Sequence, residues 1–271
     1  MAKEKVLRKL NQVTIKANLN FNVNLFKTWM RKKFQDDNKL FEKDGKMCLP
    51  KFSGAHIAIT AMNEKLCYLI LEKAITRVTK DRTGLYVIHF RDISDVVQVD
   101  TELRRDLFHF MDSFDPTLNY RAQYCIEELC VKKYIDDMFG KSIDINNEAF
   151  NLLIYLLHKA SIRVLDTAFI MILFAKKKSL SPNAILSGVS AHFTGTNEHL
   201  LKLRIDEAVK ASGKDLDDKE GEKETVPEEE GEKHEPIPEE EEPVVVEEQL
   251  IEQPDTVTKT EKKRGRGRKN E

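Results

Sequence analysis

The sequence predicts an all-α protein built from two similar helical units in tandem. In each unit a short helix, a long apolar helix and another short helix follow one another, over about residues 22–103 and again over about 120–203. Each long helix is apolar on nearly every side, so it needs packing partners all around it. Because one unit alone cannot bury such a helix, we expect the two units to pair within the chain.

The first unit, within residues 21–110, begins with a helix predicted from apolar residues at helical spacing. Ser53 can cap the long helix that follows, and Gly84 ends it. The β-branched and aromatic residues at 85–88 favour a short extended segment. The elements expected in order are a basic arm or short helix over 1–20, a helix over 22–34, a loop over 35–52, a long helix over 54–80 and a short helix over 91–103.

The second unit, within residues 111–211, repeats this order after a connector. Asn146 or Asn147 can cap its long helix, and Ser181 with Pro182 at the first helical position marks the start of the next helix. The elements expected in order are a connector over 111–119, a helix over 123–139, a compact loop over 140–145, a long helix to about 175, a helix from 181 to about 192 and a helix over 197–211.

Charge is distributed unevenly along the chain. Residues 1–211 carry 33 Lys and Arg against 25 Asp and Glu, residues 212–258 carry 4 against 19, and residues 259–271 carry 7 against 2. The middle segment lacks aromatic residues and is rich in Glu and Pro, so it cannot bury a core and is predicted to be disordered. The basic body favours a polyanionic partner over ordinary surface charge.

Several classes of function find no support in the sequence. No Cys or His pair has metal-ligand spacing with a second pair to match, so we expect free thiols and no metal or other cofactor. No Gly-rich phosphate loop or nucleophile elbow is present, which argues against an enzyme. Charged residues interrupt the apolar stretch 152–175, which predicts a core helix rather than a membrane span. The N-terminus has no apolar h-region, so we expect no signal peptide.

The repeated helix order resembles the histone fold. Residues 21–27, Phe-Asn-Val-Asn-Leu-Phe-Lys, are similar to the opening of the first helix in the B-type partner of the outer core-histone dimer. Residues 177–182, Lys-Lys-Ser-Leu-Ser-Pro, followed by Ile185 and Leu186, are similar to the second loop and third helix of the A-type partner. Over about residues 20–205 the chain therefore resembles a histone doublet, the fused histone pair found in some giant viruses.

This resemblance implies two tandem histone folds, B-type over 21–110 and A-type over 111–211, that pair as an intramolecular pseudo-dimer. In this family the paired long helices cross, and the first loop of each unit lies beside the second loop of the other. Basic residues at these two ends, and on the first helices in the middle, would contact phosphates or enter the minor groove without reading sequence. Arg82 and Thr83 match the family's minor-groove pair, and Asp92 is the candidate to clamp this arginine.

The candidate DNA-binding residues follow from these positions in the two units. They are Arg82, Thr83 and Lys141 at one end, Lys46, Lys51, Lys176, Lys177 and Lys178 at the other, and Arg31, Lys32 and Lys33 in the middle. Phosphate oxygens accept hydrogen bonds from Lys and Arg side chains, which is why these residue types are chosen. For any one of these residues, a solvated side chain with no DNA contact is the alternative.

The basic tip over 259–271 resembles an AT-hook, a flexible arginine–glycine segment. In this interpretation Arg264, Arg266 and Arg268 would lie in narrow minor grooves. A nuclear-import signal is the alternative interpretation. The acidic segment before the tip either competes with DNA for the basic body or serves as a solvating spacer.

These features predict a histone-like DNA-packaging protein that binds double-stranded DNA mostly through its backbone. Its expected protein partner is a second histone-fold protein or doublet, and no membrane or small-molecule partner is expected. The alternative is a histone-fold subunit of a transcription or architectural complex, acting through protein–protein pairing. The expected location is a chromatin-like nucleoprotein, in the virion and virus factory if the protein is viral and otherwise in the nucleus, rather than outside the cell.

Overall fold

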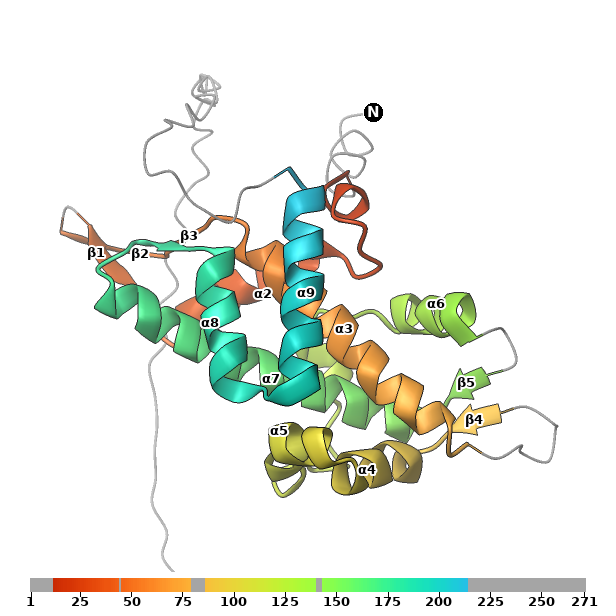
Figure 1. Ribbon diagram of the computed structural model, residues 1–271. Coiled ribbons are helices and arrows are strands. Elements are labelled where there is room, and N and C mark those ends of the chain that lie inside the picture. Colours follow the sequence, from red (N-terminus) through yellow and green to blue (C-terminus); the bar gives the residue numbers. More distant parts are fainter. Residues whose placement is uncertain (1–11, 44, 79–85, 140–142, 214–271) are drawn as a thin grey trace, which may run out of the picture. The chain divides into compact units, whose positions relative to one another are not determined.

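The computed structural model describes residues 12–43, 45–78, 86–139 and 143–213 (Figure 1). Within these ranges the chain is mostly helical with a few short strands, which confirms the all-α prediction. Residues 12–16 are helical, in the part of the predicted N-terminal arm that the structure describes. The predicted acidic segment beyond Gly213 and the basic tip lie outside the described residues.

The first half of the chain opens with a helix that Asn22 caps, because its side chain accepts a hydrogen bond from the Asn24 N–H at 3.0 Å. A β-hairpin then occupies part of the predicted loop 35–52. The elements in order are α2 (Val23–Asp36), β1 (Phe41–Lys43), β2 (Lys46–Cys48), β3 (Lys51–Phe52), α3 (Ala55–Ile75), β4 (Tyr86–Ile88), α4 (Phe90–Val99) and α5 (Thr101–Met111).

The second half contains the longest helix of the described residues, α7. Asn146 caps it, since its Oδ1 accepts from the Ala149 N–H at 2.7 Å, and this decides between the two caps that the sequence allows. Pro182 stands at the start of the next helix, as predicted. The elements in order are η1 (Tyr120–Gln123), α6 (Glu128–Phe139), β5 (Ile143–Ile145), α7 (Asn147–Phe174), β6 (Ser179–Leu180), α8 (Pro182–His192) and α9 (Gly195–Ala211).

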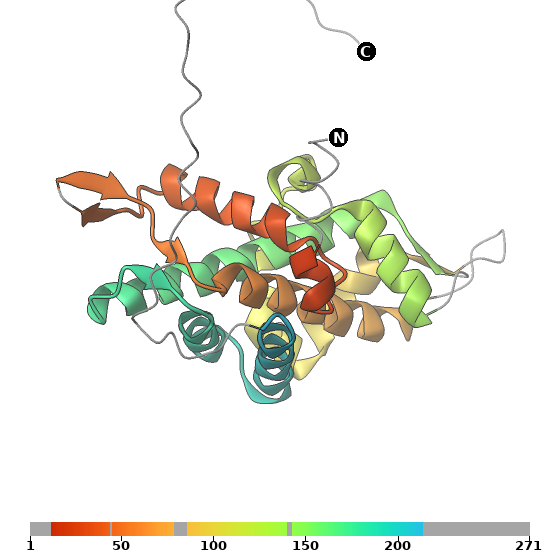
Figure 2. The ribbon, with the colours of Figure 1, turned by 90° about the horizontal axis from the view of Figure 1, so that it is seen from above.

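The two long helices α3 and α7 cross near their midpoints, with α2 and α6 on one side and α8 and α9 on the other (Figure 2). At the crossing, Asn63 Nδ2 donates to Ser161 Oγ at 2.8 Å. The Tyr124 hydroxyl donates to Asn63 Oδ1 at 2.9 Å and lies 2.7 Å from Ser161 Oγ. All three side chains are buried, so a closed polar cluster joins the two halves inside the core.

A second buried polar group holds α9 along α3. Arg204 on α9 donates to Glu64 Oε1 on α3 at 2.8 Å. The other oxygen of Glu64 accepts from the backbone N–H groups of Asn20 at 2.5 Å and Phe21 at 3.2 Å. A buried carboxylate is stable only when it is paired and hydrogen-bonded. This group therefore fixes α9 and the residues before α2 to the same helix.

Two short parallel strand pairs link the halves at opposite ends of the crossed helices (Figure 1). Lys51 in β3 lies opposite Ser179 in β6, and Tyr86 in β4 lies opposite Ile143 in β5. In each pair, one strand precedes a long helix and the other follows the other long helix. The backbone hydrogen bonds of these strands thus connect the start of each long helix to the end of its partner.

The helix predicted over 91–103 is wrong, because the chain there forms two helices, α4 and α5. Asp100 breaks them apart: its backbone is extended, and its Oδ1 accepts from the Leu103 N–H at 2.9 Å. A side-chain cap of this kind starts a new helix instead of continuing the old one. The second helix runs on to Met111 because Leu103, Leu107 and Phe110 bury one face of it.

Two further boundaries differ from the predictions. The helix predicted from residue 123 starts only at Glu128, because Tyr124 and Ile126 are buried in the core and Tyr124 reaches the crossing point of the long helices. These tertiary contacts outweigh the local helix preference of the segment. The long helix predicted to about residue 80 ends at Ile75.

Candidate nucleic-acid interface

Predicted DNA-binding lysines from both halves of the chain meet at the β3–β6 pair. The Lys51 N–H donates to the carbonyl of Lys178 at 3.1 Å, so these two lysines are neighbours although they lie far apart in the sequence. The side chains of Lys51, Lys176, Lys177 and Lys178 are all exposed. The exposed Lys46 lies in the adjacent β1–β2 hairpin, at the same end of the crossed helices (Figures 1 and 2).

A Schellman motif ends α7 and presents the three lysines that follow. The Lys176 N–H donates to the Leu173 carbonyl at 3.0 Å, and the Lys177 N–H donates to the Ile172 carbonyl at 2.8 Å. Lys176 takes the left-handed position of this motif, with φ of 52°. Glycine is the usual residue there because a side chain costs about 1–2 kcal/mol in that conformation. The chain thus carries a cation where stability alone favours glycine.

The three predicted basic residues of α2 are not equivalent. Arg31 and Lys32 are exposed, and they form no ion pair within the described residues. Lys33 is half-buried and pairs with Asp37 at 2.8 Å. Burial raises the pKa of Asp37, but hydrogen bonds from Lys33 and Lys39 outweigh it, so the pKa is lowered. Asp37 therefore stays ionised and competes with any phosphate for Lys33.

Lys39, which no sequence pattern singles out, joins the end of α2 to α7 by ion pairs with Asp37 and Asp166. Burial works against its charge, yet hydrogen bonds to Asp166 and Asp37 raise its pKa. Its ammonium group is therefore engaged in ion pairs within the protein. No local signal could reveal this contact, because Lys39 and Asp166 are 127 residues apart.

The predicted contacts at the opposite end, Arg82, Thr83 and Lys141, lie outside the described residues, as do the arginines of the basic tip, Arg264, Arg266 and Arg268. The described part of this end is the β4–β5 pair. Asp92, the predicted clamp for Arg82, accepts from the His89 N–H at 2.7 Å. Its carboxylate therefore helps to cap the first turn of α4.

Comparison with models of known protein families gives no match, and comparison with curated protein sequences gives none either. Over the described ranges, no three Cys, His, Asp or Glu side chains gather in a group that could hold a metal ion. No helix in that same part of the chain combines the length and the apolar character needed to cross a membrane. The basic surface is therefore the feature of the described residues from which a function is inferred.

Proposed function

We propose that the chain is a histone doublet, in which two tandem histone folds over residues 21–110 and 111–211 pair within one polypeptide. The repeated order of short, long and short helices supports this proposal. The crossing of α3 and α7 near their midpoints and the parallel strand pair at each end support it as well. Pairing of this kind gives each apolar long helix the partner that its composition requires.

The proposed activity is packaging of double-stranded DNA through its phosphate backbone, with little dependence on sequence. The observation that carries it is the convergence of Lys51 and Lys176–Lys178, exposed cations from opposite halves, on the β3–β6 pair. Lysines donate to phosphate oxygens, which are the same for every base pair, so they position a duplex without reading it. Arg31 and Lys32 provide a second exposed basic site on α2.

Nuclease digestion of DNA reconstituted with the purified chain tests packaging. A packaging doublet should protect a fragment of defined length, since wrapping brings successive stretches of backbone onto fixed basic sites. Continuous protection without a preferred length would indicate coating of DNA by a basic protein and would contradict the proposal.

The salt dependence of DNA affinity tests the proposed surface. Changing Lys176, Lys177 and Lys178 to Gln should flatten the slope of log affinity against log salt by about two or three units, near one per lost phosphate contact. The matched control changes the exposed Lys16, Lys133 and Lys210 to Gln, which removes the same charge from three separate elements. An unchanged slope in the first variant, or equal flattening in both, would exclude this loop from the interface.

One observation favours the alternative, a histone-fold subunit that acts through protein pairing. Ile170, Met171, Leu173 and Phe174 are exposed near the C-terminal end of α7, Phe174 to 83%. Large apolar side chains exposed close together are typical of protein contact surfaces. Such a subunit would need a second histone-fold protein before it protected DNA. Protection by the purified chain alone therefore separates the two functions.

A further inference from the structure

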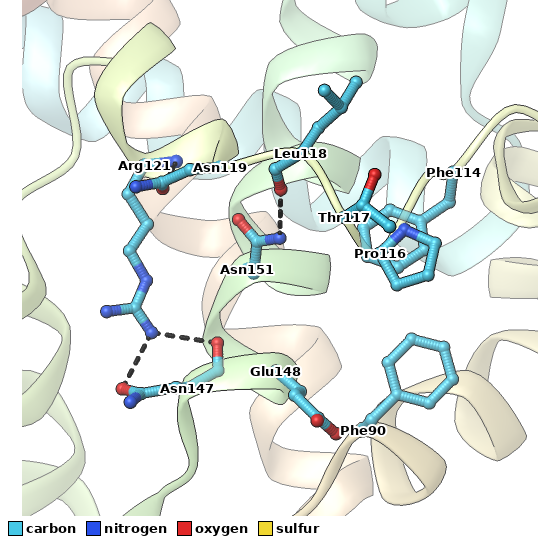
Figure 3. Close-up of a pocket in the computed structure, with 10 residues that line it drawn as sticks. All are labelled: Phe90, Phe114, Pro116, Thr117, Leu118, Asn119, Arg121, Asn147, Glu148 and Asn151. Carbon is cyan, nitrogen blue, oxygen red and sulfur yellow. Dashed lines mark hydrogen bonds between the residues drawn. The ribbon is translucent and has the colours of Figure 1, made fainter.

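A cleft of about 480 Å³ lies between the connector that follows α5 and the first turns of α7 (Figure 3). One wall holds the aromatic rings of Phe90 and Phe114 together with Pro116. Glu148 extends from α7 toward Phe90, so a single carboxylate faces the apolar wall (Figure 3). The volume is in the range of pockets that hold small ligands.

The other large polar side chains of the cleft are engaged within the protein. Both amide atoms of Asn151 bond to backbone groups, at 2.7 and 2.9 Å. Arg121 donates to two oxygens of Asn147 at 2.8 and 2.9 Å, and Glu128 at 3.1 Å offsets its charge. Glu148 is exposed, and its carboxylate makes no hydrogen bond or ion pair in the described part of the chain. Glu148 therefore supplies the unbalanced charge of the cleft.

The aromatic wall is held in place by further rings. Phe90 and Phe114 stack with centroids 5.8 Å apart and planes at 29°. Phe114 also packs against Tyr155 at 5.2 Å and Tyr120 at 5.5 Å. Aromatic faces attract cations through their quadrupole, and the effect grows where water is excluded. A cation in the cleft would therefore gain from the rings as well as from the carboxylate.

We propose that this cleft binds the cationic side chain of a lysine or arginine in a peptide segment of a partner protein. The cation lies between the Glu148 carboxylate and the Phe90 and Phe114 rings, while Pro116 contacts the methylene groups of the side chain. The dipole of α7 opposes a cation at its N-terminus by about half a charge, and the full charge of Glu148 outweighs this. A neutral side chain gains nothing from the carboxylate, and an anion is repelled by it.

This site is separate from the surface of Lys51 and Lys176–Lys178, the main DNA contact proposed for the described residues. The cleft adjoins the β4–β5 end of the crossed helices, and Lys51 and Lys176 lie at the β3–β6 end (Figure 1). The inference does not depend on DNA packaging, because peptide binding and DNA binding can be measured separately on the same chain.

The experiment is an NMR titration of the full chain with the peptide acetyl-Gly-Ala-Lys-Ala-Gly-amide. The lysine peptide should shift the amide signals of Asn147 and Glu148. The same peptide with Nε-acetyllysine, which keeps the methylene stem and loses the charge, should bind at least about tenfold more weakly. This comparison needs no variant of the protein, and equal binding of the two peptides would overturn the proposal.

Single substitutions test the contributions of the carboxylate and of the aromatic rings to peptide affinity separately. Glu148→Gln should lower affinity for the lysine peptide about tenfold, and Phe90→Leu should weaken it while keeping an apolar wall. The control Glu42→Gln removes an exposed carboxylate from β1, at the other end of the crossed helices, and should leave the affinity unchanged. Unchanged affinity in Glu148→Gln, or an equal loss in Glu42→Gln, would overturn the site.

DNA affinity is the second readout for the same variants. Glu148→Gln should keep DNA affinity within about twofold of the native value, since a single exposed charge outside an interface contributes little. A DNA affinity that changes in parallel with peptide affinity would place the cleft in the DNA interface and would overturn the assignment to a peptide.

Discussion

Replacing Asn63 by Ala tests whether the two halves are joined at the crossing of α3 and α7. The native amide donates to the Ile59 carbonyl at 2.7 Å and to Ser161 Oγ at 2.8 Å, and its oxygen accepts from Tyr124 at 2.9 Å. Its oxygen also lies 3.0 Å from Ser161 Oγ, whose single proton is shared with Tyr124, so alanine removes three hydrogen bonds and this further contact. Ser161 and Tyr124 remain 2.7 Å from each other, so neither hydroxyl loses its last partner.

The expected loss follows from these contacts. Three hydrogen bonds at about 1 kcal/mol each, with about 1 kcal/mol more for the small cavity, give a loss of about 3–4 kcal/mol in the free energy of unfolding. For a folded body of this size, such a loss lowers Tm by about 10 °C. Because the cluster joins residues from both halves, unfolding should remain a single transition at a lower midpoint.

Equilibrium urea denaturation followed by circular dichroism measures this loss. The control Asn20→Ala changes an exposed asparagine, whose own side chain makes no hydrogen bond in the described residues, and should shift stability by less than about 0.5 kcal/mol. Combining Asn63→Leu with Ser161→Ala and Tyr124→Phe removes every polar member and should recover much of the stability. A loss below about 1 kcal/mol in Asn63→Ala would refute the reasoning.

Three further predictions follow from single features of the chain. His158 packs against Tyr124 and Trp29, and burial, followed by the charges of Lys159 and Lys33, lowers its pKa to about 4. Between pH about 6.5 and about 4, the unfolded chain therefore binds a proton at His158 that the folded chain does not. The free energy of unfolding should fall by up to about 3 kcal/mol as the pH drops through this window. Denaturation of His158→Phe over the same pH range should show a smaller fall. Lys176→Gly should raise the free energy of unfolding by about 1 kcal/mol while flattening the salt slope of DNA binding by about one unit, whereas Lys177→Gly should flatten the slope without stabilising. Deleting residues 212–258 removes 4 Lys and Arg with 19 Asp and Glu, so DNA affinity measured at low salt should rise if this segment screens the basic body. Deleting residues 259–271 should lower both the DNA affinity and the preference for AT-rich duplexes. If neither deletion changes DNA binding, the tail takes no part in it.

Local sequence patterns are enough to predict the helices and the starts of α7 and α8, but the start of α3 differs, since Gly54 and not Ser53 holds its cap position. These predictions use local features: the apolar character of the long helices, an asparagine at the start of α7, and Ser181 with Pro182 at the start of α8. Each feature acts within about one helical turn of its own position. The same local reasoning placed the run Lys176–Lys178 at the end of a long helix and exposed to solvent, as the structure has it.

Contacts between residues far apart in the sequence depend on the packing of the whole fold. The bridge from Lys39 to Asp166 and the reach of Tyr124 to Asn63 join residues that no local pattern connects. The meeting of Lys51 with the lysines after α7 is predicted only by the resemblance to a histone doublet. The break at Asp100 has a local origin instead, because its side chain caps the N–H of Leu103 three residues further on. Local propensity is worth tenths of a kcal/mol per residue, roughly, whereas burying a large side chain or satisfying a buried polar group is worth about 1–3 kcal/mol. Where the two disagree, as at Tyr124, packing decides the structure.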